Sequence, residues 1–221
     1  MNYRLISFDL DGTLVDTARE IAEAANRTLE EHGIERRPPA EIEQLIGAGT
    51  RALMLQLLAR AFLDRPSLAQ RVRPDAVLHS MDHHYALTTG SSAAPYGGCH
   101  ESLAQLKGDG IRLACTTNKE LRHARRVLEV TGLERYFELV IGGDSLPEKK
   151  PHASVLRHVV AQLGGELNFT AHVGDSRTDV EAARNAGVAA WAVPYGYNAG
   201  EPIAEAKPQR IFANLLEVAA H

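Results

Sequence analysis

Five short, almost continuously apolar segments, each ended by polar or glycine residues, constrain the fold of this 221-residue chain more than any other feature. Such segments are typical of parallel strands that are buried on both faces of a sheet. Helical patterns closed by glycine separate the later segments. The alternation therefore predicts an α/β fold with a doubly wound parallel sheet. The predicted strands are 5–8, 111–116, 137–141, 170–173 and 188–193.

One long stretch, from Thr17 to Ala93, interrupts this alternation and contains no convincing strand. Its apolar residues recur at helical spacing, and Thr17-x-x-Glu20 predicts a capped helix start. Further helices are expected over 41–46, 51–63 and roughly 68–85. We therefore predict an α-helical cap domain at residues 17–93, inserted into a catalytic core that is formed by residues 1–16 and 94–221.

Composition narrows the class of protein. A formal net charge of -4 and an aromatic content of 5% provide neither the basic field nor the stacking platform that nucleic-acid binding needs. Two cysteines cannot form a disulfide framework, and no apolar stretch approaches the length of a membrane-spanning helix. Asp9 comes too early for a signal peptide. We expect a cytoplasmic monomer or homodimer that binds neither nucleic acid nor membrane.

The polar residues that follow the predicted strands define the candidate site, because ligands of open α/β sheets bind beyond the carboxyl ends of the strands. These residues are Asp9, Asp11, Thr117, Asn118, Asp144, Lys149, Lys150, Asp175 and Asp179. The set contains neither a serine–histidine pair nor a cysteine–histidine zinc spacing, and the chain has neither glycine-rich nucleotide motif. A cluster of carboxylate oxygens suits Mg²⁺.

This set of residues predicts phosphoryl transfer. Asp9 and Asp11 are two residues apart on an extended segment and can face one pocket. One carboxylate could attack phosphorus and form an aspartyl phosphate, while the other protonates the leaving alcohol and later activates water. A lysine and hydroxyl donors would compensate the charge of the phosphoryl oxygens. We expect Asp175 to complete a metal site and Asp179, one helical turn later, to orient it.

Four segments, in this order along the chain, resemble the signature motifs of the haloacid dehalogenase superfamily. They are Asp9-Leu10-Asp11-Gly12-Thr13-Leu14-Val15-Asp16, Thr116-Thr117-Asn118-Lys119, Lys149-Lys150-Pro151 and Gly174-Asp175-Ser176-Arg177-Thr178-Asp179. Within the superfamily, the chain is most similar to the phosphoglycolate phosphatases, on the segments 46–49, 142–144 and 195–198. The resemblance implies a Rossmann-like core with a helical cap and Mg²⁺-dependent hydrolysis of a phosphate monoester.

The same resemblance implies a role for each motif residue. Asp9 would be the nucleophile and Asp11 the acid/base. Thr117 and Lys150 would bind the phosphoryl group. Asp9, the backbone carbonyl of Asp11, and Asp175 would hold Mg²⁺.

Five further residues are expected to support the site. Asn118 and Asp144 would orient the groups that touch the substrate or the metal, and Asp144 could position the phosphate-binding lysine. Gly47 and Gly49 could bring a cap loop close to the phosphate, because glycine permits close backbone approach. Arg51, in the same loop, could contact a substrate carboxylate.

His79, His83 and His172 are predicted to have structural roles and not to bind a metal or substrate. His79 and His83 are four residues apart, but no third ligand is indicated, so a solvated helix face is favoured over a metal site. His172 lies within a predicted strand and is expected to be a core histidine with satisfied hydrogen bonds.

The leading hypothesis is a phosphatase that acts on a small phosphorylated metabolite, with 2-phosphoglycolate as the first candidate. Two alternatives remain open. A phosphotransferase similar to β-phosphoglucomutase would return the phosphoryl group to a sugar, and a phosphate-sensing binding protein would show no turnover. A dehalogenase is disfavoured, because displacement of halogen from carbon does not need the acid/base that Asp11 provides.

Overall fold

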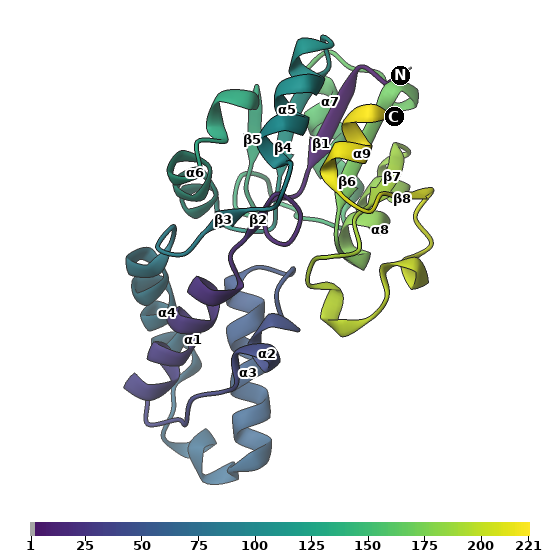
Figure 1. Cartoon of the computed structure of the whole chain (residues 1–221). Coiled ribbons are helices and arrows are strands. Elements are labelled where there is room, and N and C mark those ends of the chain that lie inside the picture. The colour runs from purple at the N-terminus through teal and green to yellow at the C-terminus, as the bar shows by residue number, and fades with distance from the viewer. Residues whose placement is uncertain (1–2) are drawn as a thin grey trace.

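A six-stranded parallel sheet organises the protein, whose computed structural model describes residues 3–221 (Figure 1). The strand order is β5-β4-β1-β6-β7-β8. The strands are β1 (Leu5–Phe8), β4 (Arg112–Thr116), β5 (Leu139–Ile141), β6 (Thr170–Gly174), β7 (Ala189–Ala192) and β8 (Arg210–Ile211). The first five lie where the sequence predicts strands, and β8 is a short exposed edge strand that the sequence analysis missed.

Helices cover both faces of this sheet, which confirms the predicted doubly wound architecture (Figure 1). The helices are α5 (Cys99–Gly108), α6 (Leu121–Val130) and α9 (Leu215–Ala220) on one face, and α7 (Ala153–Gln162) and α8 (Arg177–Ala186) on the other. Their apolar faces form two hydrophobic clusters with the strands. Trp191 of β7 packs in the first of these, edge-on against Phe212.

The chain reverses its direction across the sheet at β1. From β1 it continues to β4 and β5 on one side, and it then returns to β6, β7 and β8 on the other. Loops that leave β1 and its two neighbours therefore diverge and open a crevice at the carboxyl ends of these strands, where open α/β sheets bind ligands.

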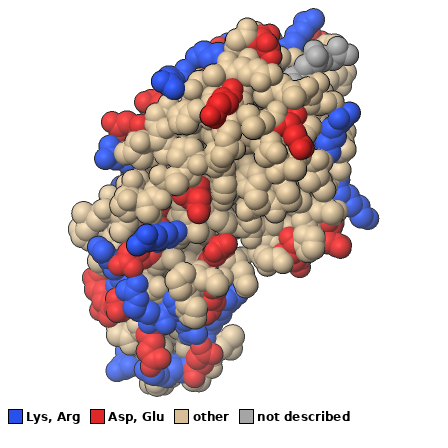
Figure 2. Space-filling view, in the orientation of Figure 1, with Lys and Arg blue, Asp and Glu red and all other residues tan. Residues whose placement is uncertain are grey.

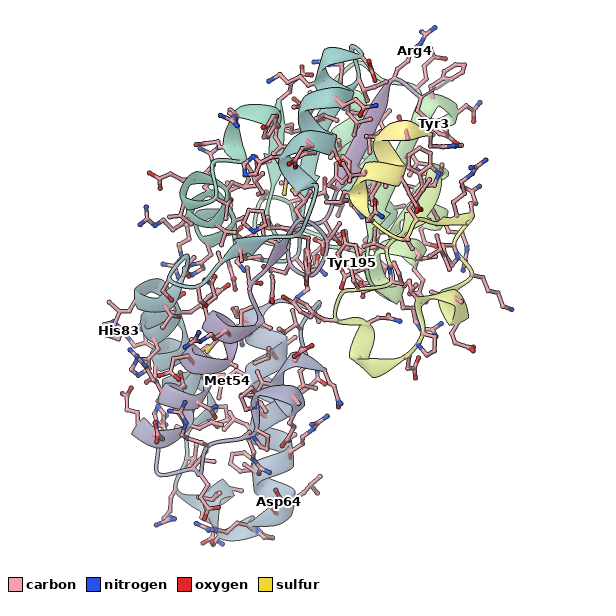
Figure 3. All side chains as sticks on the ribbon, in the orientation of Figure 1. Tyr3, Arg4, Met54, Asp64, His83 and Tyr195 are labelled. Carbon is pink, nitrogen blue, oxygen red and sulfur yellow. The ribbon has the colours of Figure 1, made fainter. Side chains whose placement is uncertain are left out.

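Four helices form a separate bundle next to this crevice (Figure 1). They are α1 (Ala18–Glu31), α2 (Pro39–Glu43), α3 (Thr50–Asp64) and α4 (Pro74–Thr88). Every buried member of their hydrophobic cluster lies between Ile21 and Tyr85, so this part has a core of its own. Met54 points into that core, whereas Asp64 lies at the far end of the bundle (Figure 3).

A two-stranded antiparallel ribbon connects the bundle to the sheet. It consists of β2 (Val15–Asp16) and β3 (Ala94–Pro95). Tyr197 fixes the outgoing strand, because its hydroxyl donates to Asp16 Oδ1 at 2.7 Å and accepts from the Thr17 amide at 2.8 Å. Both connections between the two parts are thus short and lie side by side.

The boundaries of three predicted helical features are corrected by the structure. The helix expected over 68–85 is a 3-10 helix (Pro66–Gln70) followed by α4, because proline favours the first turn of a helix and Pro74 starts a new one. Pro39 likewise starts α2 earlier than predicted. The predicted capping box at Thr17 is wrong, since Thr17 makes no side-chain cap hydrogen bond.

Charged side chains of both signs are intermixed over the helical bundle (Figure 2). Many of them form ion pairs, such as Arg36 with Glu23 at 2.6 Å and with Glu30 at 2.9 Å. Exposed pairs of this kind each contribute little to stability. None of the helices between residues 3 and 221 combines the length and the apolar character that crossing a membrane requires.

Candidate active site

Asp9 follows β1 directly and lies in a buried charge cluster. Lys150 Nζ donates to Asp9 Oδ1 at 2.8 Å and to Asp179 Oδ1 at 2.6 Å. All three side chains are almost completely buried. The structure thus places Lys150, and not its neighbour Lys149, against the candidate nucleophile, since Lys149 is exposed and donates to the Ala48 carbonyl.

Asp175, at the end of β6, completes a group of three carboxylates. Oxygens of Asp9, Asp175 and Asp179 lie within 4.8 Å of one another. Asp175 is held by Thr13 Oγ1 at 2.9 Å and by the Tyr197 amide at 2.7 Å. Sequence analysis expected Asp179 to orient the metal ligands, and the structure places one of its oxygens within the same group.

Glycine is required around Asp175. A Cβ atom added at Gly12 or Gly196 would collide with the Asp175 carboxylate. The backbone of two loops therefore packs directly against this side chain and fixes its position at the strand end.

The electrostatics of this cluster favour a cation. Burial raises the pKa of Asp9 to about 7, although Lys150 opposes the effect. Burial and the neighbouring carboxylates likewise raise the pKa of Asp175. The pKa of Asp179 is lowered in spite of its burial, because Lys150 and His172 stabilise the ionised form. One lysine lies against three buried carboxylates, so ionising all three is costly without a further positive charge, and an all-oxygen set of this kind fits a divalent cation such as Mg²⁺.

The raised pKa of Asp9 predicts a pH-dependent difference in stability between two metal-free proteins. Folded Asp9 retains a proton that the unfolded chain, with a pKa near 3.8, releases, so the free energy of unfolding falls as pH rises from about 4 to 7. The Asp9→Asn variant lacks this titration. We measure the Tm of both proteins in excess chelator and take the difference, variant minus wild type. We expect this difference to be larger at pH 8 than at pH 5 by at least about 3 °C.

Because this comparison is a difference between two proteins, the titrations of histidines outside the cluster cancel. The lowered pKa of His123, for example, makes stability rise with pH in both proteins alike. A Tm difference that does not change between pH 5 and pH 8 would contradict the raised pKa of Asp9.

Asp11 lies two residues beyond Asp9 and is held by two donors. Thr17 Oγ1 and Lys119 Nζ each donate to Asp11 Oδ1 at 2.6 Å. The Thr17 hydroxyl therefore donates to Asp11 and does not cap α1. Glu20, the other half of the predicted capping box, accepts a hydrogen bond from the Gly90 amide at 2.9 Å.

Lys119 is a site residue that sequence analysis left without a role. Its side chain is 1% exposed. Burial alone would lower the pKa of this lysine, but Asp11 and Tyr85 raise it above its ordinary value, so Lys119 is charged. Its position two residues after Thr117, in the loop that leaves β4, was the signal available in the sequence.

Thr117 and Asn118 lie in the same loop. Thr117 is buried, and its amide donates to the Ile141 carbonyl at 2.9 Å. Asn118 Nδ2 donates at 3.0 Å both to the Gly47 carbonyl and to the Lys150 carbonyl. Asn118 therefore links the helical bundle to the loop that carries the buried lysine.

The loop between α2 and α3 approaches the sheet closely. Gly49 has a φ of +90°, and a Cβ atom added there would lie 2.9 Å from the Asn118 carbonyl oxygen. Thr50 Oγ1 donates to Glu120 Oε1 at 2.7 Å. A pocket lies between this loop and the strand ends. Its lining consists of Asp9, Asp11, Ile21, Ile46, Gly47, Gly49, Thr50, Leu53, Tyr85, Thr117, Asn118 and Lys119.

We expect Gly49→Ala to lower kcat/KM at least about 10-fold, because the added methyl group strains the backbone and prevents the loop from reaching Asn118. Gly33→Ala is the matched control, since Gly33 also has a positive φ but has nothing within 4 Å of an added Cβ. Steady-state kinetics and the Tm of both variants test this. Equal loss of activity in the two variants would show that backbone strain alone is responsible.

Two predicted site residues lie elsewhere. Asp144 is exposed and accepts a hydrogen bond from the Leu121 amide at 2.7 Å, so it holds the start of α6 and does not position Lys150. Arg51 is exposed and lines a different cavity with His79 and other residues of α4, outside the pocket that contains Asp11. Sequence spacing placed both residues near the site but could not show the direction of their side chains.

His172 is a buried histidine, as expected, but it also touches the site. Its ring nitrogens lie 3.1 Å from Ser7 Oγ and 3.2 Å from Asp179 Oδ1. Burial lowers the pKa of His172, so the ring is neutral near pH 7. It supports Asp179 from the interior of β6.

Fold and site together define an enzyme with a Rossmann-like α/β core, an acid-rich centre at the strand ends and a helical insertion above it. Residues 6–193 match the family model described as haloacid dehalogenase-like hydrolase. The chain belongs to this family, as its four motifs had indicated.

Several curated relatives resemble nearly the whole chain. Phosphoglycolate phosphatase 1 of Pseudomonas aeruginosa is 39% identical over 97% of this chain and 78% of its own length. The phosphoglycolate phosphatase of Vibrio cholerae is 36% identical over 97% of this chain and 96% of its own. Among solved structures, a predicted phosphoglycolate phosphatase from Haemophilus somnus has a TM-score of 0.91 at 29% identity, covering 100% of this chain and 98% of its own.

Proposed function

We propose that this phosphatase of the haloacid dehalogenase-like family hydrolyses the phosphate monoester of a small metabolite through an aspartyl phosphate, and that 2-phosphoglycolate is its first candidate substrate. One observation carries the proposal. Asp9 touches Lys150 within a group of three carboxylates, while Asp11, two residues later, faces the same pocket. The names of the relatives support the choice of substrate.

Asp9 and Asp11 have different roles in the proposed reaction. Asp9 attacks phosphorus, and the bond from phosphorus to the bridging oxygen breaks while Asp11 gives that oxygen a proton. Asp11 then takes a proton from water, and the resulting hydroxide releases phosphate and restores Asp9. Lys150, which donates to Asp9, and Thr117, which lines the pocket, would balance the charge of the phosphoryl oxygens.

Asp9, Asp175 and the backbone carbonyl of Asp11 would hold Mg²⁺, with the Asp179 carboxylate in the same group. When bound, Mg²⁺ compensates the charge of the phosphoryl oxygens and of the carboxylates. The cost of ionising all three carboxylates beside a single lysine supports that assignment.

The helical bundle is the part that would exclude water and select the substrate. We take residues 17–93 as the cap domain and residues 1–16 and 94–221 as the core; residues 1 and 2 lie outside the described range. The bundle has its own hydrophobic cluster, and its Gly47–Thr50 loop covers the pocket. A closed cap strengthens the electrostatic interactions inside the site.

The proposal is tested by a screen of phosphorylated metabolites, ranked by kcat/KM from the release of inorganic phosphate. We expect small phosphorylated acids to rank first. A sugar phosphate that is isomerised without release of phosphate would instead show a phosphotransferase of the β-phosphoglucomutase kind. No turnover of any ester, including an aryl phosphate, would indicate a phosphate-binding protein.

A further inference from the structure

Lys119 is the cation that lines the pocket beside Asp11. Among the side chains that line the pocket between the Gly47–Thr50 loop and the strand ends, Lys119 is the one lysine, arginine or histidine within the described residues. Lys150, the other buried lysine of the site, is occupied by Asp9 and Asp179. Arg51 lines a different cavity and is not among the residues of this pocket.

The contacts of Lys119 leave part of its ammonium group available. An ammonium has three N–H donors, and one of them is directed to Asp11 Oδ1 at 2.6 Å. Tyr85 of α4 lies on another side, with Lys119 Nζ 5.1 Å from the centre of its ring, a distance typical of cation–π contacts. The charge is therefore held rigidly, away from water, at the boundary between the bundle and the sheet.

The position next to Asp11 determines what this charge can bind. Asp11 gives its proton to the bridging oxygen of the ester, so the atoms that follow this oxygen in the leaving group lie beside Lys119. In a phosphorylated 2-hydroxy acid, a single carbon separates the bridging oxygen from the carboxylate. That carboxylate would lie beside Lys119 when the bridging oxygen is next to Asp11, where it could accept from an N–H that Asp11 does not use.

We propose that Lys119 binds a carboxylate of the leaving group and so selects small phosphate monoesters that carry a carboxylate on the ester-bearing carbon. This inference rests on the proposed phosphatase function and replaces Arg51 as the residue that recognises the substrate acid. Ile21, Ile46 and Leu53, which also line the pocket, offer no polar group, so its one cationic side chain is that of Lys119. Tyr85 completes the subsite from the cap.

The test compares two esters of nearly equal shape, 2-phosphoglycolate and ethyl phosphate, in which a methyl group replaces the carboxylate. We expect Lys119→Met to lower kcat/KM for 2-phosphoglycolate about 10- to 100-fold more than for ethyl phosphate, as expected for loss of a charge-assisted hydrogen bond. Lys107→Met, on the exposed surface of α5, is the matched control and should leave the ratio of the two kcat/KM values unchanged.

Three outcomes would overturn the proposal. Equal losses for both esters would show that Lys119 acts only by holding Asp11. If Arg51→Met loses the preference for 2-phosphoglycolate over ethyl phosphate and Lys119→Met keeps it, Arg51 is the residue that binds the carboxylate. If the wild-type enzyme shows no preference for 2-phosphoglycolate over ethyl phosphate, the pocket has no subsite for a carboxylate. If the wild type releases no phosphate from any ester, the proposed function itself fails, which is a distinct result.

A direct measurement keeps the proposal testable even if Lys119→Met does not fold. In a crystal structure of the Asp9→Asn variant with 2-phosphoglycolate, a carboxylate oxygen of the ligand should lie within hydrogen-bond distance of Lys119 Nζ. A carboxylate that contacts the Gly47–Thr50 backbone instead, with no contact to Lys119, would refute it. Lys119→Arg, which retains the charge, should keep most of the preference for 2-phosphoglycolate.

Discussion

The Asp9→Asn variant is expected to lose at least about 10³-fold in kcat while it keeps the fold, as for removal of a covalent catalytic group. Asparagine has the same shape as aspartate but lacks the charged oxygen that attacks phosphorus. Lys150 remains paired with Asp179 at 2.6 Å in the variant, so no buried charge is left without a partner. Release of inorganic phosphate and circular dichroism measure activity and fold separately.

A labelling experiment connects this loss of activity to chemistry at Asp9. Wild-type enzyme that is quenched in acid during turnover of a ³²P-labelled ester should carry the label on the peptide that contains Asp9. Asp109→Asn, at the exposed end of α5, is the control for the same substitution elsewhere and should behave as the wild type does. Label on another residue, or near-normal turnover by Asp9→Asn, would disprove the covalent mechanism.

The strands could be predicted because burial on both faces leaves a plain signal. All four residues of β1 are buried, and the polar residue that ends the strand is Asp9. By contrast, β8 has two exposed residues at the edge of the sheet, and so short a segment has no apolar pattern to detect. An edge strand of two residues is defined by its neighbour in space, which sequence spacing does not record, whereas β5, at the other edge, was predicted from its apolar run.

Residues of the site could be predicted where the backbone alone brings them together. Asp9, Asp11 and Asp175 follow adjacent strands, so the topology of the sheet determines that they meet. Asp144 also follows a strand, but it accepts a hydrogen bond from the Leu121 amide and turns away from the site. The direction of a loop side chain depends on such local competition.

Contacts between the cap and the core could not be predicted. The Tyr85 ring meets Lys119 only because the helical bundle lies over the strand ends, and no spacing in the sequence links these residues. Thr17 shows the same limit at short range. Its position in front of α1 predicts a helix cap. Its hydroxyl instead donates a hydrogen bond to the carboxylate of Asp11, in the preceding loop.

Removal of divalent cations should reduce activity to background, and Mg²⁺ should restore it. The physical reason is that Asp9 must be ionised to attack phosphorus, and ionising these buried carboxylates beside a phosphate dianion needs a further positive charge. Asp175→Asn replaces one of these carboxylates by a neutral amide, which is a weaker ligand for Mg²⁺. We expect this variant to need at least about 10-fold more Mg²⁺ for half of its maximal activity.

The thermal stability of the same two proteins separates metal binding from catalysis. Without metal, Asp175→Asn should be at least as stable as the wild type, because burial and repulsion already raise the pKa of Asp175 and make its ionised form costly. With Mg²⁺, the wild type should gain several degrees in Tm, since a ligand that binds only the folded state stabilises it, and the variant should gain less. Full activity in excess chelator would exclude a metal from the reaction. Equal gains in Tm would remove Asp175 from the metal site, because a carboxylate that binds the cation cannot be lost without weakening its effect on stability.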